Sequence, residues 1–134
     1  MKKTVHVVGA VMEREDRSIL CALRSPDMTL PNLWEFPGGK IEAGETPEQS
    51  LKREIQEELG CEVSVGGQIK DVVYEYEAVI VHLLTYEANI VNGAPEAKEH
   101  AELKWVKREQ LSDLTWAPAD IPTIEALQKQ GNMR

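Results

Sequence analysis

Along most of the chain, apolar residues either alternate with polar ones or gather in short runs, and both patterns are typical of β-strands. Two such segments, residues 5–11 and 19–23, flank a short charged stretch and predict a hairpin at the start of the fold. Further strands are predicted over residues 63–65, 68–77, 78–88 and 103–106. We expect turns at Gly66-Gly67 and Asn92-Gly93, and one helical turn over residues 107–111.

A helix is predicted between residues 46 and 60. Thr46 can cap the first turn, Pro47 suits the first helical position, and Gln49 can complete a capping box with Thr46. The helix is expected to run to about Leu59. Gly60 follows, and glycine readily adopts the left-handed conformation that ends a helix.

A second, amphipathic helix is predicted near the end of the chain, from Pro118 or Ile121 to Gln130. Its inward face is expected to consist of three apolar residues: Ile121, Ile124 and Leu127. The sequence contains no repeat and no linker-like segment. It therefore predicts a single domain over residues 1–134, of mixed α/β architecture, in which a sheet lies between helices.

The chain of 134 residues has 23 acidic and 15 basic side chains and a formal net charge of −8. This negative charge disfavours binding to a nucleic acid polymer or an anionic membrane. Cys21 and Cys61 lack the spacing of a zinc site or a disulfide framework. The three histidines (His6, His82 and His100) are scattered and are expected to be surface or partly buried residues. No signal peptide or segment of transmembrane length is recognisable, so we expect a cytoplasmic protein.

Three carboxylates lie close together on the first predicted helix. At about 100° per residue, Glu54, Glu57 and Glu58 fall within an arc of about 100° beside the apolar face. Like charges at this spacing repel by roughly 0.2–0.5 kcal/mol per pair, so this acidic strip requires a cation. Lys52 and Arg53 are expected to project toward other faces. Oxygen ligands without Cys or His favour Mg²⁺ or Mn²⁺, whereas a solvated acidic face is the alternative interpretation.

The acidic strip is part of a longer motif with fixed spacing: Gly39, Glu45, Arg53-Glu54-Ile55, Glu57-Glu58 and Gly60. In residue types and spacing this motif resembles the box of the Nudix hydrolase family, in which an aliphatic residue follows the last glycine. Cys61 stands at that last position, a mild departure because cysteine packs as a small hydrophobic residue. The resemblance implies a Nudix-type α/β/α sandwich with a mixed central sheet.

Two further segments, residues 33–42 and 117–122, resemble the branch of the family that includes MutT and the CTP pyrophosphohydrolases. The resemblance implies a site for Mg²⁺, or for Mn²⁺ in its place. Its ligands are expected to be the backbone carbonyl of Gly38 and the carboxylates of Glu54, Glu57 and Glu58. A later loop supplies one more acidic ligand, for which Glu99 is the candidate; the alternative is an ordinary loop carboxylate.

The same resemblance implies the reaction. Water attacks the β-phosphorus of a nucleoside triphosphate, and nucleoside monophosphate and pyrophosphate are released. Glu54 is the expected general base. The other carboxylates that can serve in this role are Glu57, Glu58 and Glu99.

The remaining box residues are expected to support this chemistry. Arg53 is counted with the catalytic motif, and its expected ion pair with Glu45 would brace the box loop against the helix. Gly39, Glu45 and Gly60 are therefore classed as structural residues of the motif.

Four residues are assigned to substrate binding: Arg24, Phe36, Lys40 and Asp120. Residues 24–35 are rich in turn-forming residues and predict a binding loop. The resemblance implies that Arg24 contacts phosphate; the alternative is a solvated arginine. Phe36 or Trp34 can stack on the base, and the alternative for these aromatic residues is packing in the core. Lys40 follows two glycines, but a P-loop is excluded because isoleucine replaces the serine or threonine that follows the lysine of that motif.

Asp120 bears on the choice of base. MutT-like enzymes that act on 8-oxo-dGTP carry Asn at this place, and an ionised Asp differs because it only accepts hydrogen bonds. An acceptor suits the N4 amino group of cytosine and also the N1–H and N2 amino group of guanine, whereas it repels O4 of uracil and thymine. Residues 118–122 resemble the CTP and modified-dCTP pyrophosphohydrolases, so we favour CTP, dCTP or modified dCTP, with 8-oxo-dGTP as the alternative. Further alternatives are a dinucleotide hydrolase of the diadenosine type, which Tyr74 and Tyr76 leave open, a nucleotide-sugar hydrolase, and a catalytically silent nucleotide sensor; the proline typical of the ADP-ribose type is not recognisable. The expected partner is a small nucleotide, and the expected assembly is a monomer or a homodimer.

Overall fold

The computed structural model describes residues 2–132 of the chain. Within these residues the strands and helices are, in order, β1 (Lys3–Met12), β2 (Ser18–Leu23), β3 (Trp34–Glu35), β4 (Gly38–Lys40), α1 (Pro47–Leu59), β5 (Glu62–Glu75), β6 (Val79–Asn92), β7 (Glu102–Lys107) and α2 (Ile121–Asn132). Two 3₁₀ segments, η1 (Arg108–Asp113) and η2 (Pro118–Asp120), precede α2. No helix in this part of the chain is long and apolar enough to cross a membrane.

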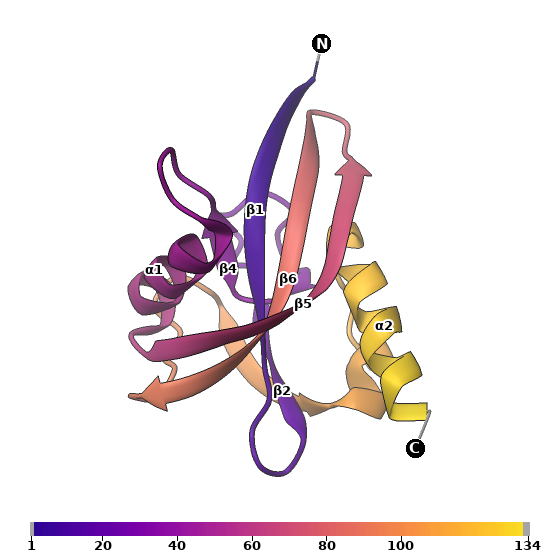
Figure 1. Ribbon diagram of the computed structural model, residues 1–134. Helices are drawn as coiled ribbons and strands as arrows, with labels where there is room; N and C mark the ends of the chain where they lie inside the picture. Colours follow the sequence, from indigo (N-terminus) through magenta and orange to yellow (C-terminus); the bar gives the residue numbers. More distant parts are fainter. Residues whose placement is uncertain (1, 133–134) are drawn as a thin grey trace.

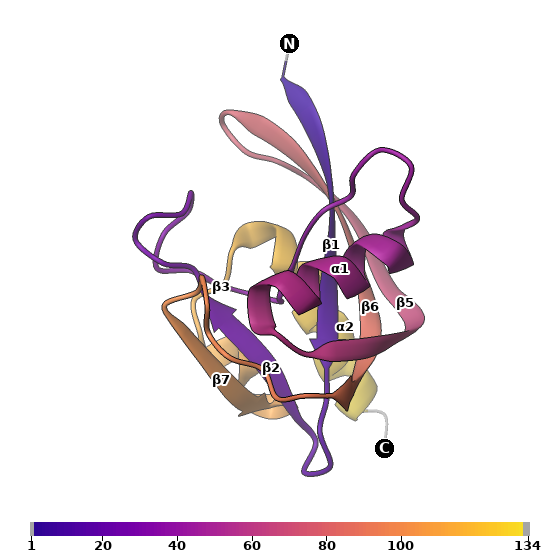
Figure 2. The same ribbon diagram turned by 90° about the vertical axis from the view of Figure 1, so that its left-hand side faces the viewer.

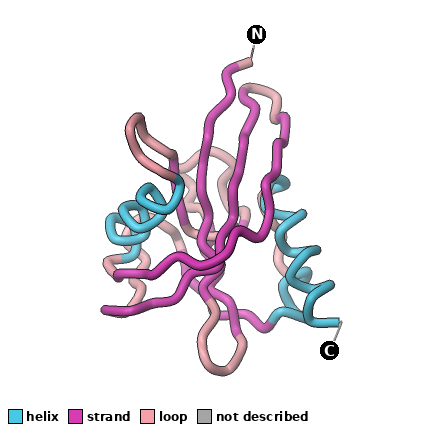
Figure 3. The backbone as a smooth tube through the Cα atoms, viewed as in Figure 1, coloured by secondary structure: helices cyan, strands magenta, loops and turns pink. Residues whose placement is uncertain are grey.

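A four-stranded mixed sheet in the order β4-β1-β6-β5 forms the centre of the fold. β1 runs parallel to β6, whereas β4 and β5 run antiparallel to their neighbours. α1 lies on one side of this sheet and α2 on the other (Figures 1 and 3). The prediction of a mixed sheet between helices is therefore confirmed.

β2 does not form the predicted hairpin with β1. It belongs to a second, three-stranded sheet in the order β3-β2-β7, seen beside α1 in Figure 2. Among the described residues, its pairing with β1 is limited to one bridge between Glu13 and Ile19. Both faces of β2 are buried, since Leu20 packs in the cluster under α1 while Ile19 and Cys21 pack in the cluster under α2. Pairing with β7 places the strand between these clusters, so the charged turn redirects the chain instead of folding it back on β1.

Gly66-Gly67 is not a turn between strands, as the sequence predicts, but lies inside β5. The pairing of β5 with β6 is irregular between Val65 and Lys70, which is the signature of a β-bulge. Bulges bend strands, and β5 changes direction sharply along its length (Figure 1). The chain reverses later, where the N–H of Tyr76 donates to the carbonyl of Val79.

α1 begins and ends where the sequence predicts. The Thr46 side chain accepts a hydrogen bond from the N–H of Gln49 (3.1 Å), and the Gln49 side chain accepts one from the N–H of Thr46 (2.9 Å). Both halves of the predicted capping box are therefore present. At the other end, Gly60 has a φ of 73°, and its N–H donates to the carbonyl of Gln56. Local sequence alone sets the limits of this helix.

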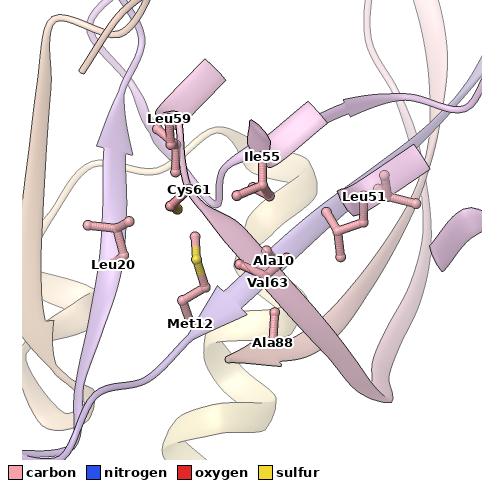
Figure 4. Close-up of a cluster of buried hydrophobic side chains, with 10 residues drawn as sticks. Ala10, Met12, Leu20, Leu51, Ile55, Leu59, Cys61, Val63 and Ala88 are labelled. Carbon is pink, nitrogen blue, oxygen red and sulfur yellow. The ribbon is translucent and has the colours of Figure 1, made fainter. Parts of the chain in front are cut away.

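The apolar face of α1 is buried against the central sheet. Leu51, Ile55 and Leu59 are 0% exposed and pack in one cluster with Ala10 and Met12 of β1 (Figure 4). Burying three such side chains contributes roughly 5–9 kcal/mol of hydrophobic stabilisation. This contact fixes the rotation of α1, and with it the direction in which the glutamates of the acidic strip project.

α2 confirms the second predicted helix but corrects its inward face. Ile124 and Leu127 are buried, and Thr123 is buried beside them, whereas Ile121 is 42% exposed. Residues three apart fall about 60° short of a full helical turn, so Ile121 and Leu127 lie about 120° apart around the axis. The buried face of α2 is therefore centred on Ile124 and Leu127, and Ile121 lies at its margin.

Candidate active site

Gly39 brings β4 into direct contact with the acidic strip of α1. A Cβ atom at position 39 would overlap the carboxyl carbon of Glu54, so only glycine allows this approach. The Glu54 side chain is 15% exposed as a result. Burial raises the pKa of Glu54, while the neighbouring Arg53 guanidinium acts in the opposite direction. The structural role expected for Gly39 thus has a physical basis: without a side chain at position 39, the carboxylate of Glu54 can pack directly on the backbone of β4.

Glu45 and Arg53 form the ion pair that the sequence predicts. The Arg53 Nε lies 2.7 Å from Glu45 Oε2, and Nη2 lies 2.9 Å from Oε1, so the pair is bidentate. The Ser50 hydroxyl also donates to Glu45 (2.6 Å). The hydrogen bonds from Arg53 and Ser50 lower the pKa of Glu45 to about 2. The loop before α1 is thereby fastened to the helix it precedes.

Arg53 does not project away from the acidic strip, contrary to the sequence-based expectation. Its Nη1 lies 3.1 Å from Glu54 and 3.2 Å from Glu57, while Nη2 donates to the carbonyl of Lys40. The backbone position of Arg53 does face another way, but its long side chain curls back toward the carboxylates. One guanidinium therefore serves Glu45, Glu54 and Glu57 together.

Glu58 is the glutamate of the strip that forms no ion pair with Arg53 among the described residues. Its Oε1 is buried and has no hydrogen-bond partner among the described residues. Burial, followed by the charges of Glu54, Glu35 and Glu99, raises the pKa of Glu58 to about 8. Glu99, on the loop before β7, thus lies close enough to the strip to act on it electrostatically. A cation placed here would relieve both the missing contact and the repulsion.

The donor set suits a hard divalent ion, although the side chains require rearrangement to bind one. The strip offers carboxylate oxygens and neither sulfur nor imidazole, which is the chemistry that Mg²⁺ prefers. Within residues 2–132, no three or more His, Cys, Asp or Glu side chains are gathered closely enough to hold a metal ion as they stand. The guanidinium of Arg53 is bound to Glu54 and Glu57, so these carboxylates must turn from it to become ligands. Gly38 pairs with Gly9 in the sheet, and the ligand role of its carbonyl remains a prediction.

Arg24 braces the 24–33 loop instead of pointing into open space. Its Nη1 lies 2.7 Å from Glu35, and its Nε and Nη2 donate to the carbonyl and hydroxyl of Thr29. All three guanidinium nitrogens are therefore engaged within the protein, and the expected phosphate contact of this residue remains a prediction. Lys40, by contrast, is exposed at the end of β4, so its assignment to substrate binding remains a prediction.

His100 is a site residue that the sequence did not reveal. Its side chain is 0% exposed, and Nε2 lies 2.8 Å from Oε2 of Glu35. Glu35 therefore holds both Arg24 and His100, and its charge also acts on Glu58 and Asp120. The only local signal for His100 is its position directly after Glu99.

Asp120 is buried where η2 meets the loop before β4. Its side chain accepts a hydrogen bond from the N–H of Phe36 (3.4 Å), and the Tyr76 hydroxyl accepts one from the neighbouring N–H of Ala119 (2.9 Å). Burial, followed by the charge of Glu35, raises the pKa of Asp120 well above its ordinary value. Burial and the nearby charge of Glu35 therefore favour the protonated form of this carboxyl.

The ring of Phe36 is not available to stack on a base, which corrects the sequence-based assignment. Phe36 is 3% exposed, and its ring packs against Trp116 with centroids 4.9 Å apart. Its link to the site is instead the backbone N–H that holds Asp120. Trp34, which is partly buried, is the aromatic side chain left beside the loop.

Comparison with known proteins places these features in a family. The NUDIX domain matches residues 3–127. The chain belongs to the Nudix family. The Nudix relative named CTP pyrophosphohydrolase from Escherichia coli K12 is 40% identical over 124 residues, which cover 92% of this chain and 91% of the relative.

A second Nudix relative is the putative 8-oxo-dGTP diphosphatase 2 of Mycobacterium tuberculosis H37Rv. It is 37% identical over 135 aligned positions, covering 98% of this chain and 93% of the relative. Among solved structures, the MutT protein of the Nudix hydrolase family from methicillin-resistant Staphylococcus aureus is 44% identical, with a TM-score of 0.79. That match covers 98% of this chain and 100% of the other. The chain is therefore a Nudix hydrolase in both sequence and fold.

Proposed function

We propose that this Nudix hydrolase converts nucleoside triphosphates and water to nucleoside monophosphates and pyrophosphate, with Mg²⁺ held by the acidic strip. The observation that carries the proposal is the buried, unpartnered Oε1 of Glu58, which lies among other carboxylates. A purely structural helix face has no reason to hold such a group, because an unpaired buried polar atom destabilises the fold by roughly 1–3 kcal/mol. The same atom is well suited to bind a cation.

The proposed ligands are Glu54, Glu57 and Glu58 on α1, with Glu99 from the loop before β7 and the carbonyl of Gly38. Mn²⁺ is expected to substitute, because it prefers the same oxygen ligands. When bound, Mg²⁺ screens the phosphate charge and increases the acidity of water. This screening is needed because a triphosphate brings about four negative charges to a protein that already carries −8.

Glu54 is the proposed general base. Its pKa is raised by burial, which makes it a stronger base than an exposed carboxylate. Glu54 takes a proton from the attacking water as the water oxygen bonds to the β-phosphorus. The bond from that phosphorus to the oxygen shared with the α-phosphate breaks, and the monophosphate leaves with this oxygen. Arg53 holds the carboxylates of Glu54 and Glu57 in place until the cation and substrate arrive.

Cytosine nucleotides remain the proposed substrates, but the raised pKa of Asp120 corrects the ionised, acceptor-only carboxylate expected from the sequence. A protonated carboxyl offers one donor and one acceptor, which match N3 and the N4 amino group of cytosine. An ionised carboxylate offers two acceptors, which match the adjacent N1–H and N2 amino group of guanine better. Because burial favours protonated Asp120, cytosine gains a two-bond partner. The protonated form also fits O6 and N1–H of guanine, so 8-oxo-dGTP is the second candidate.

A Mg²⁺-dependent screen of nucleoside triphosphates tests this function. The panel includes CTP, dCTP, 5-methyl-dCTP and 8-oxo-dGTP, and the products are separated as pyrophosphate or orthophosphate. We expect pyrophosphate, with the highest kcat/KM on a cytosine nucleotide. Turnover of 8-oxo-dGTP alone would reverse the choice of base.

Two outcomes of the screen point to the remaining candidates. Hydrolysis of dinucleotides or nucleotide sugars, with none of the triphosphates, would reassign the substrate class. Nucleotide binding without any turnover would make the chain a nucleotide sensor, in spite of its complete set of box glutamates.

A further inference from the structure

We propose that His6 and His82 form a second metal site, specific for a transition-metal ion of the Cu²⁺ type and separate from the acidic strip. The two residues lie opposite each other on the parallel strands β1 and β6, in the centre of the mixed sheet. Neither residue contacts the glutamates of α1 through any hydrogen bond or ion pair of the described residues. The site therefore stands independently of the proposed triphosphate chemistry.

The two rings face each other through the same type of nitrogen. Nδ1 of His6 lies 2.8 Å from Nδ1 of His82, and the rings meet edge to face, at 85°. Nitrogens at this distance share a proton, since two bare electron pairs so close would repel. One imidazole is therefore the donor and the other the acceptor.

Asp71 on β5 decides which ring is the acceptor. Its Oδ1 lies 2.7 Å from Nε2 of His82, so the carboxylate accepts the Nε2–H of that ring. Neutral His82 then carries its proton on Nε2 and presents an electron pair at Nδ1. His6 must supply the proton between the two Nδ1 atoms. A carboxylate behind an imidazole in this way orients the ring and strengthens it as a metal ligand.

The spacing of the two nitrogens fits neighbouring ligands of a tetragonal ion. Nitrogens about 2.0 Å from a metal lie about 2.8 Å apart at a right angle, but about 3.3 Å apart at the tetrahedral angle. The 2.8 Å of the hydrogen-bonded pair is already close to the right-angle value, so a tetragonal ion requires the smaller movement of the rings, and Cu²⁺ has the highest affinity for nitrogen ligands among Cu²⁺, Ni²⁺ and Zn²⁺. On binding, the His6 proton moves from Nδ1 to Nε2 through the solvent, so that His6 stays neutral, and the rings turn slightly so that both Nδ1 electron pairs meet at the ion.

The surroundings leave room for this ion. His6 is exposed, and the side chains of His82 and Asp71 are 26% and 57% exposed, so water can fill the other coordination positions. Asp71 is engaged with Nε2 and acts as a supporting group, so the protein supplies two ligands. Within residues 2–132 no group of three or more His, Cys, Asp or Glu side chains is placed to hold a metal ion, so the proposed site has two protein ligands and takes the others from water. The net charge of −8 adds a general attraction for cations.

Copper titration of the full chain in excess Mg²⁺ tests the proposal. Mg²⁺ occupies carboxylate sites but binds imidazole poorly, so the remaining copper reports on nitrogen ligands. Electron paramagnetic resonance is expected to show one Cu²⁺ with splitting from two nitrogens. Binding should raise Tm, because the ion ties β1 to β6 in the folded state only.

Three variants decide the assignment. His6→Asn and His82→Asn are each expected to weaken this binding by more than about 100-fold, and Asp71→Asn by about 10-fold. The three variants keep the amino terminus and the acidic strip of the wild type. Copper bound at either of these places would therefore be the same in all four proteins and would cancel in the comparison. Unchanged triphosphatase activity and circular dichroism would show that the variants are folded. Equal copper affinity in wild type and His82→Asn, or a spectrum with oxygen ligands only, would overturn the proposal.

Discussion

Nε2 of His100 lies 2.8 Å from Oε2 of Glu35, a contact that joins two parts of the chain 65 residues apart. His100 directly follows Glu99, the proposed ligand on the loop before β7, and Glu35 lies in β3 beside the loop that Arg24 braces. One partly buried hydrogen bond therefore joins the loop that carries the proposed metal ligand Glu99 to the predicted binding loop that begins at Arg24.

Replacing His100 by alanine is expected to lower the free energy of unfolding by about 2–3 kcal/mol. The substitution removes a buried ring, whose Nδ1 has no hydrogen-bond partner among the described residues, and it leaves Oε2 of Glu35 without the partner at 2.8 Å. Urea denaturation of both proteins measures the change. His82→Ala is the matched control, since its ring is partly exposed and should contribute much less. Equal losses in the two variants would contradict the special position of His100.

Glu57→Gln is expected to reduce kcat by about 100-fold or more, because the change removes a negatively charged ligand while keeping the volume of the side chain. Steady-state kinetics with Mg²⁺ and the best triphosphate of the screen give the value. Glu48→Gln provides the control on the same helix, as Glu48 is exposed and only near Lys52 (3.9 Å). Near-normal turnover by the Glu57 variant would rule out its role as ligand.

Stability of the Mg²⁺-free protein is expected to fall as the pH rises from about 4.5 to about 8. Across this range the unfolded chain loses the proton of Glu58 while the folded chain keeps it, because the pKa of Glu58 is raised to about 8. In Glu58→Gln the part of this loss that Glu58 causes is absent, while the parts caused by Glu54 and Asp120 remain. The variant should therefore match wild type near pH 4 and have a Tm higher by several degrees above pH 8, measured with a chelator present. Parallel pH profiles for the two proteins would contradict the buried position of this carboxylate.

The preference for cytosine over 8-oxo-guanine is expected to depend on the protonation of Asp120. As the pH rises through the raised pKa of this residue, the ratio of kcat/KM for dCTP to that for 8-oxo-dGTP should fall. Asp120→Asn keeps one donor and one acceptor at every pH, so its ratio should remain constant. The ratio is the right quantity to measure, because effects of pH on metal binding are common to both substrates. A falling ratio in Asp120→Asn as well would assign the effect to another group.

The parts of the fold that were predictable from the sequence are those that short stretches determine. The capping box at Thr46 and the left-handed Gly60 act within one helical turn, and both were located correctly. The ion pair between Glu45 and Arg53 also spans only eight residues. The box helix and its glutamates could therefore be found without knowledge of the rest of the molecule.

The errors concern features that depend on distant residues. β2 leaves β1 because two separate clusters bury both of its faces, and Phe36 is buried because Trp116 packs on it. The pairing of His100 with Glu35 required the β7 loop to meet β3. Arg53 is a different case, since only the conformation of its long side chain, not its place on the helix, was misjudged.

The parallel pairing of β1 with β6 has a consequence for folding during synthesis. His6 and His82 are neighbours in the sheet but 76 residues apart in the chain. At roughly 5–20 residues per second, a ribosome delivers β6 about 4–15 s after β1. For those seconds α1 can form, since its ends are set locally, yet one edge of β1 has no partner and remains open to other chains. The residues of α1 are therefore synthesised several seconds before the strand that completes the central sheet on which this helix packs.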